Sequence, residues 1–95
     1  MNLRDSVIIV TGSATGLGSS VVKQVAAKGA RVVINYTKSE KEAHETKAVC
    51  DYLGVESIVC QADVSLDEDC RRMAYEAMEK WGRIDGLVNL SLIHI

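Results

Sequence analysis

The stretch of sequence that decides the fold is residues 6–18, which read SVIIVTGSATGLG. Its first half is a short run rich in β-branched residues, typical of a strand that is buried on both faces of a parallel sheet. Glycines end that run, and apolar residues at helical spacing then predict a helix over residues 16–28, with Gly29 as its stop. The stretch therefore predicts a strand, a tight glycine turn and a helix in direct succession.

The same alternation continues along the chain. Residues 31–36 and 57–62 are further buried-strand patterns, and a fourth strand begins at residue 86. Helices are expected between these strands, and capping boxes at residues 39–42 (SEKE) and 65–68 (SLDE) are expected to open them. Strict alternation with short links favours parallel strands joined by right-handed crossovers. The predicted fold class is α/β, with about four strands and three helices forming the N-terminal part of a doubly wound parallel sheet.

Composition and charge exclude several classes of protein. Of the 95 residues, 47% are hydrophobic and 25% are charged, and the net charge of −2 gives no reason to expect binding to a nucleic acid or an anionic membrane. No apolar run approaches the ~20 residues of a membrane-spanning helix, and the first residues lack the apolar core of a signal peptide. We expect a cytoplasmic protein without nucleic-acid or membrane partners.

The cysteines and histidines indicate neither a disulfide framework nor a metal site. Cys50, Cys60 and Cys70 are odd in number and form no Cys-x-x-Cys pair, so we expect buried or half-buried thiols. His44 lies in a helical pattern with no second ligand at helical spacing, and a surface position is expected for it. No metal is predicted.

The glycine turn at residues 11–18 (TGSATGLG) has the properties of an anion-binding loop. It precedes a helix, where free backbone N–H groups and the positive end of the helix dipole favour a pyrophosphate. Glycine permits the sharp turn, the close approach of phosphates and the packing of the helix against the strand. The loop lacks the Gly-Lys-Ser/Thr ending of nucleoside-triphosphate loops, so that class is disfavoured.

The pattern Thr-Gly-x-x-x-Gly-x-Gly after a first strand resembles the short-chain dehydrogenase/reductase family, which has a Rossmann fold and uses NAD or NADP. Within that family, the loop and the run INYTKSE at residues 34–40 look most like bacterial 3-oxoacyl-carrier-protein reductases and glucose dehydrogenases. The resemblance implies that the loop binds the cofactor through Gly12, Ser13, Thr15, Gly16, Leu17 and Gly18.

The end of the second predicted strand is where this family reads the adenosine ribose. An Asp there accepts hydrogen bonds from the ribose hydroxyls of NAD, whereas this chain has Asn35 followed by Tyr36. Without that carboxylate a 2′-phosphate is not repelled, and Thr37, Lys38 and Ser39 offer hydroxyls and one cation to hold it. NADP is therefore favoured over NAD. NAD stays open, because Thr15 stands where many NADP-dependent relatives have a basic residue.

Two further positions are in register with the family. Asp63 and Val64 follow the third strand and resemble its acidic and apolar pair, which implies that the carboxylate binds the adenine amino group and the valine lines the ring pocket. The alternative is that Asp63 caps the next turn. Asn89 matches the first residue of the family's Asn-Asn-Ala-Gly motif.

The family's reaction requires a Ser, a general acid/base Tyr and a Lys four residues after that Tyr, and the resemblance places all three beyond residue 89. The three tyrosines of this chain are each followed, four residues on, by a glutamate, which raises a tyrosine pKa. Residues 90–95 (LSLIHI) break the family pattern and are interpreted as a translated sequencing adapter, so His94 receives no role. Residues 1–89 are then the dinucleotide-binding part of one Rossmann domain.

The sequence thus predicts an inactive cofactor-binding fragment of an oxidoreductase. The complete enzyme would transfer hydride between NADP(H) or NAD(H) and an alcohol or carbonyl substrate, and the family implies a homo-oligomer for the full-length protein only. A second interpretation is a short protein that binds a nucleotide without catalysis. A flavodoxin-like module is a third, and it leaves Asp63 and Val64 unexplained.

Overall fold

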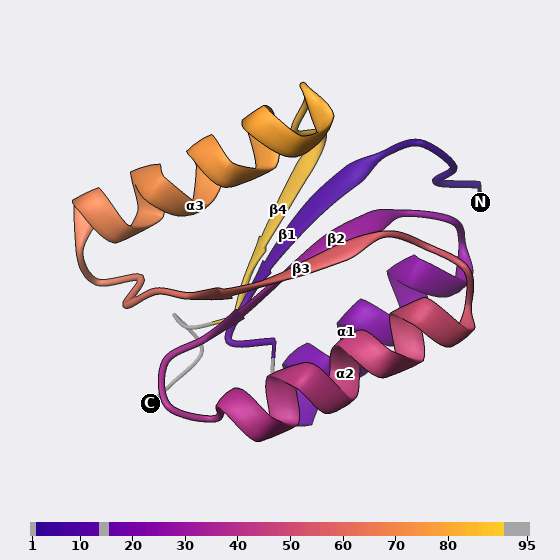
Figure 1. Cartoon of the computed structure of the whole chain (residues 1–95), viewed down its shortest axis with the longest axis horizontal. Coiled ribbons are helices and arrows are strands. Elements are labelled where there is room, and N and C mark those ends of the chain that lie inside the picture. Colours follow the sequence, from indigo (N-terminus) through magenta and orange to yellow (C-terminus); the bar gives the residue numbers. More distant parts are fainter. Residues whose placement is uncertain (1, 14–15, 91–95) are drawn as a thin grey trace.

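The computed structural model describes residues 2–13 and 16–90 and confirms an α/β fold with strands and helices in strict alternation (Figure 1). In chain order the elements are β1 (Val7–Thr11), α1 (Gly16–Ala27), β2 (Arg31–Tyr36), α2 (Glu40–Tyr52), β3 (Ser57–Gln61), α3 (Asp67–Trp81) and β4 (Gly86–Asn89). Each element lies within a few residues of its predicted place, because buried β-branched runs and glycine stops are strong local signals.

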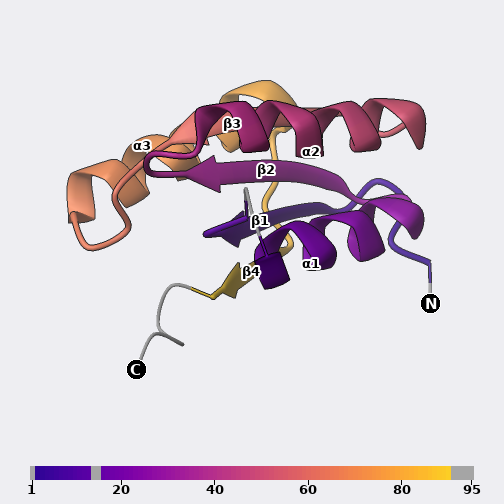
Figure 2. The same cartoon turned by 90° about the horizontal axis from the view of Figure 1, so that it is seen from below.

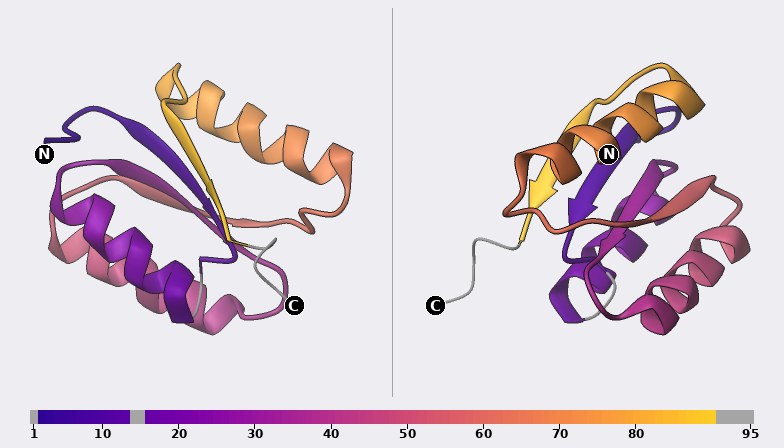
Figure 3. Two further views of the ribbon diagram at one scale, coloured as in Figure 1. Left: turned by 180° about the vertical axis from the view of Figure 1, so that it is seen from behind. Right: turned by 60° about the vertical axis from the view of Figure 1, so that its left-hand side comes forward.

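The sheet is parallel throughout, and its strand order is β3-β2-β1-β4. Helices α1 and α2 cover one face and α3 covers the other (Figures 2 and 3). The order reverses at β1, from which the chain proceeds first to β2 and β3 and later to β4 on the opposite side. A doubly wound sheet binds its ligands at such a reversal, outside the carboxyl ends of the strands.

Two apolar clusters hold the layers together. The first, between the sheet and the α1/α2 layer, consists of Val10, Val22, Ala26, Val32, Ile34, Ala43 and Cys50. The second, beneath α3, consists of Val7, Ile9, Val33, Cys60, Ala62, Met73 and Ala77. Because β1 and β2 supply residues to both clusters, these central strands are buried on both faces, as their composition predicted.

Both predicted capping boxes are wrong. Ser39 and Leu66 precede α2 and α3, and neither forms a side-chain hydrogen bond that caps its helix. Ser65, which was expected to cap α3, instead donates its hydroxyl to the Asp63 carboxylate at 2.6 Å. The Asp63 carboxylate is a stronger acceptor than the helix backbone offers, so Ser65 forms part of the turn that precedes α3 and does not cap the helix.

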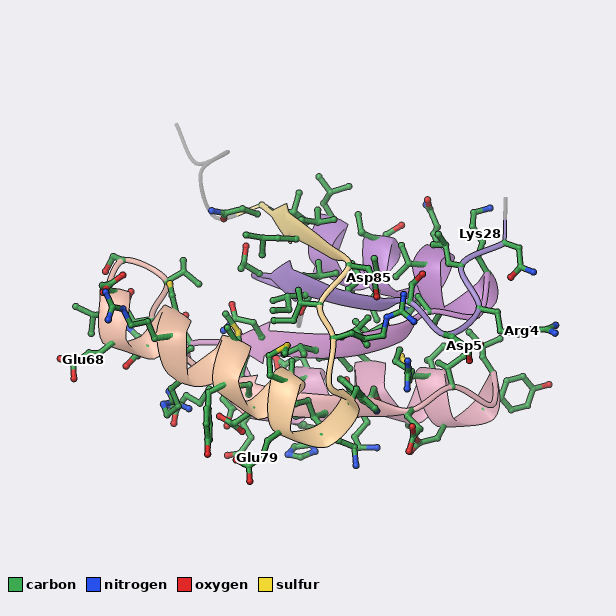
Figure 4. The ribbon with its side chains drawn as sticks, turned by 90° about the horizontal axis from the view of Figure 1, so that it is seen from above. Arg4, Asp5, Lys28, Glu68, Glu79 and Asp85 are labelled. Carbon is green, nitrogen blue, oxygen red and sulfur yellow. The ribbon has the colours of Figure 1, made fainter. Side chains whose placement is uncertain are left out.

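Asp85 joins the amino-terminal ends of β1 and β4 and lies beside the start of β1 (Figure 4). Its Oδ2 accepts a hydrogen bond from the backbone N–H of Val7 at 2.8 Å, and the guanidinium of Arg83 binds both carboxylate oxygens at 2.7 and 2.8 Å. These hydrogen bonds, that of Arg83 first, hold the pKa of Asp85 below its usual value. At the amino-terminal end of the strands, opposite the predicted loop, the Asp85 carboxylate thus links the start of β1 to the segment that precedes β4.

The cysteines and His44 lie as predicted. Cys50 and Cys60 are buried free thiols and Cys70 is a half-buried one. His44 is exposed on α2, with Nε2 3.6 Å from Glu40 Oε2. Within residues 2–13 and 16–90, no His, Cys, Asp and Glu side chains cluster as a metal site would, and no helix combines the length and apolar character needed to cross a membrane.

Candidate functional site

The predicted cofactor residues that the structure describes gather at the carboxyl edge of the sheet. The parallel register aligns Thr11 with Asn89 and Tyr36 with Gln61, so all four strands end along this edge. The glycine loop leaves β1 there, beside the strand-order reversal. Thr15 lies outside the described residues.

Asn35 at the end of β2 is buried, with 1% of its surface exposed. Its Oδ1 accepts a hydrogen bond from the backbone N–H of Gly12 at 2.9 Å, and its Nδ2 donates to the carbonyl oxygen of Ala62 at 3.1 Å. Both ends of the amide are thus used to connect the glycine loop with the end of β3. A direct contact of this side chain with a ribose stays a prediction. The burial of the Asn35 side chain favours a role in holding the glycine loop instead.

Ser13, also fully buried, completes the contact between the loop and β2. Its backbone N–H donates to the carbonyl oxygen of Asn35 at 3.0 Å, and its Oγ accepts the backbone N–H of Asn35 at 2.7 Å. The N–H groups of Gly12 and Ser13 are therefore both directed at Asn35. Any N–H groups offered to a phosphate must come from later in the loop or from α1.

The start of α1 is open beside Gly16. Gly16 has φ of +59°, and within residues 2–13 and 16–90 no atom, apart from its chain neighbours and the backbone of its own helix, lies within 4 Å of the position that a Cβ would take there. Leu17 is 62% exposed. The first N–H groups of a helix have no partner within the helix, so Gly16, Leu17 and Gly18 present donors at its positive end. These residues fit the diphosphate of a dinucleotide.

Gly18 allows the first turn of α1 to pack closely against the glycine loop, whereas Gly16 leaves open space. A Cβ on Gly18 would lie 2.1 Å from the carbonyl oxygen of Gly12 and 2.7 Å from Cα of Ser13. Its φ is not positive, so the requirement for glycine at this position comes from space alone. The first turn of α1 thus rests directly on the beginning of the loop.

Beyond Asn35 the chain turns outward. Tyr36 is half-buried, whereas Thr37 and Lys38 are exposed. The Gln61 side chain donates to the carbonyl oxygen of Thr37 at 3.1 Å, a contact that no sequence pattern indicated. Partial burial and then the nearby Glu40 carboxylate raise the pKa of Tyr36, so this tyrosine is poorly suited to release a proton.

Asp63 occupies the turn between β3 and α3. Its Oδ1 accepts hydrogen bonds from the N–H of Ser65 at 2.9 Å and from the Ser65 hydroxyl at 2.6 Å, which lower the pKa of Asp63. The turn-capping role considered for this residue is thus present. The side chain is exposed, and its predicted contact with adenine stays a prediction. Val64 is half-buried and packs against the cluster beneath α3.

Asn89 at the end of β4 is bonded to the residue that precedes the glycine loop. Its Oδ1 accepts the hydroxyl of Thr11 at 2.8 Å, and Thr11 Oγ1 in turn accepts the N–H of Leu90 at 3.0 Å. The loop pattern begins with Thr11, for which the sequence predicted no role. A hydroxyl that ends an otherwise apolar buried strand was the signal that could have identified it.

Comparison with known proteins agrees with this geometry. A family model for short chain dehydrogenases matches residues 6–91. The short-chain dehydrogenase/reductase homolog YusS of Bacillus subtilis (strain 168) is 36% identical over 89 residues, which are 94% of this chain and 82% of that protein.

Solved structures give the same result. A short chain dehydrogenase from Burkholderia cenocepacia J2315 in complex with NADP has a TM-score of 0.89 and 35% identity, over 94% of this chain and 36% of that one. For a hydroxysteroid dehydrogenase from Escherichia coli the TM-score is 0.86 and the identity 27%, over 93% of this chain and 37% of that one. The chain thus spans little more than a third of either structure. It belongs to the short-chain dehydrogenase/reductase family.

Proposed function

We propose that this chain is the cofactor-binding part of an NADP-dependent oxidoreductase whose substrate is an alcohol or carbonyl compound. The observation that carries the proposal is the open start of α1 at Gly16, at the same sheet edge as the exposed pair Thr37 and Lys38. The first feature suits a diphosphate and the second a 2′-phosphate. When bound, the nicotinamide cofactor would accept or donate the hydride.

The residues of this chain would bind and orient the cofactor. The N–H groups at the start of α1 would hold the diphosphate, and Lys38 would pair with the 2′-phosphate that distinguishes NADP from NAD. The Gln61 contact at 3.1 Å supports this assignment, because it holds the backbone of Thr37 and thereby limits where Lys38 can reach. The NADP-bound relative from Burkholderia cenocepacia also supports it.

We expect Lys38→Ala to weaken NADP binding by about five- to tenfold and to leave NAD binding unchanged, because the lysine would meet only the additional phosphate. Dissociation constants of both cofactors, measured by calorimetry, test this. Lys41→Ala is the matched control, since Lys41 is also exposed but lies in α2. Equal losses for NADP and NAD in the Lys38 variant would contradict the assignment.

We further propose that the natural protein continues past Asn89 with the catalytic Ser, Tyr and Lys, and that residues 90–95 derive from a sequencing adapter. Amplifying and sequencing the source DNA across codon 89 tests this. An Asn-Ala-Gly continuation followed later by Tyr-x-x-x-Lys is the expected result. A genomic LSLIHI followed by a stop codon would contradict it.

A short protein that binds a dinucleotide without catalysis is the second candidate. It is favoured by one observation, that the chain covers 82% of YusS, a family homolog of similar length. Nicotinamide-dependent turnover by the complete gene product would exclude this candidate.

A further inference from the structure

Asn35 forms hydrogen bonds to the start of the glycine loop through both its side chain and its backbone. The side chain accepts the Gly12 N–H at 2.9 Å, and the backbone exchanges hydrogen bonds of 2.7 and 3.0 Å with Ser13. We propose that Asn35 is a positioning residue that sets the diphosphate subsite and takes no part in selecting between NADP and NAD. The inference rests on the proposed cofactor function and deepens it.

The surroundings of the side chain require an amide. Oδ1 faces a donor, the N–H of Gly12, at 2.9 Å. Nδ2 faces acceptors, namely the carbonyl oxygens of Ala62 at 3.1 Å and of Tyr36 and Cys60 at 3.4 Å. A carboxylate would oppose these carbonyl groups, and an apolar side chain would leave the Gly12 N–H without this acceptor. Asparagine supplies one acceptor and one donor in the volume available.

The position of Gly12 determines where the first turn of α1 can lie, because the two are in close contact. The carbonyl oxygen of Gly12 lies so close to Gly18 that a Cβ there would be 2.1 Å away. Gly18 belongs to the first turn of α1, whose N–H groups would face the diphosphate. Asn35 therefore acts on the diphosphate indirectly, through Gly12 and the first turn of α1. It also engages the Gly12 and Ser13 N–H groups, which leaves the later part of the loop and the helix as the sources of donors.

Lys38, by contrast, lies beyond the point where the chain turns outward and takes no part in these hydrogen bonds as the structure describes them. The diphosphate and 2′-phosphate subsites should then respond separately to substitution. NADP reports on both subsites, and adenosine 2′-monophosphate, which has no diphosphate, reports on the second alone.

The experiment measures the affinity of the 95-residue chain for these two probes by calorimetry. We expect Asn35→Ala to weaken NADP binding about tenfold and adenosine 2′-monophosphate binding less than about twofold. Ser13→Ala should show the same pattern more weakly. Ser57→Ala is the control, because Ser57 is also a buried polar residue but begins β3, at the end of the sheet opposite the glycine loop. It should change neither affinity.

Equal weakening of both probes, or no weakening of either, would overturn the inference. If Asn35→Ala does not fold, Ser13→Ala is judged by the same criterion. If the parent chain binds neither probe, the proposed function fails, and the inference is then judged by hydrogen exchange at the Gly12 N–H. Exchange that is faster in Asn35→Ala than in Ser57→Ala supports the positioning role, and equal rates refute it.

Discussion

Gly18→Ala is expected to destabilise the chain by about 3 kcal/mol and to abolish NADP binding. The added Cβ would lie 2.1 Å from the carbonyl oxygen of Gly12 and 2.7 Å from Cα of Ser13. Both are backbone atoms, so no side chain can rotate away, and the loop or the start of α1 must shift. Urea unfolding gives the free energy, and calorimetry gives the affinity for NADP.

Gly54→Ala is the matched control for this prediction. Gly54 has φ of +80°, and among the described residues no atom other than those of its chain neighbours lies within 4 Å of a Cβ, so alanine there adds backbone strain without a clash. We expect a cost of about 1 kcal/mol and unchanged NADP binding, because Gly54 follows α2, far from the loop in the sheet topology. If the two variants lost equal stability, space at Gly18 would not be the cause.

Asn35→Asp is expected to be nearly as damaging, and its effect should depend on pH. At neutral pH it would place a buried carboxylate against the carbonyl oxygen that now accepts from Nδ2 at 3.1 Å, at a cost of about 3 kcal/mol. A protonated carboxyl group has one donor and one acceptor, as the amide does, so acid should relieve the loss. We therefore expect Asn35→Asp to lower the stability of the fold. If Asn35 bound the ribose directly, the same substitution would instead increase the preference for NAD over NADP.

The direction of the pH dependence follows from the pKa of the new carboxyl group. Burial raises that pKa in the folded state above the unfolded value of about 3.9. The variant therefore matches the parent best below that value and loses stability as pH rises through the folded-state pKa. Urea unfolding of both proteins from pH 4 to 8 measures the difference at each pH.

Thr37→Asp is the control, since it adds the same charge to an exposed residue at the same strand end. We expect it to leave the free energy of unfolding nearly unchanged at every pH. If Asn35→Asp were equally harmless, the side chain would be free to turn outward in solution, and its hydrogen bonds to the loop would not be essential.

The location of the candidate site could be predicted from sequence, but the roles of its residues could not. A glycine turn between a buried strand and a helix implies the carboxyl edge of a parallel sheet, and the structure places Asn35, Asp63 and Asn89 at that edge. Pattern alone gave no way to know that Asn35 would face inward. Its orientation depends on the Gly12 N–H and the Ala62 carbonyl, which lie 23 and 27 residues away in the chain.

The start of α3 shows that sequence patterns can fail to predict hydrogen-bond partners even between residues close together in the chain. Ser65 satisfied the capping pattern, yet the Asp63 carboxylate, two residues earlier, accepts both its N–H and its hydroxyl. A capping pattern describes which partners are available, and competition among them is settled only when the local backbone takes its shape.

The sequence by itself determined the order and type of the elements, the parallel sheet and the family, because buried runs, glycine stops and the loop pattern are properties of neighbouring residues. Only the tertiary structure decided that the first loop N–H groups are used by Asn35, that Thr11 binds Asn89, and that Gly18 is required by space. Each of these depends on groups brought together from different strands, where the chain must satisfy every buried donor and acceptor at once.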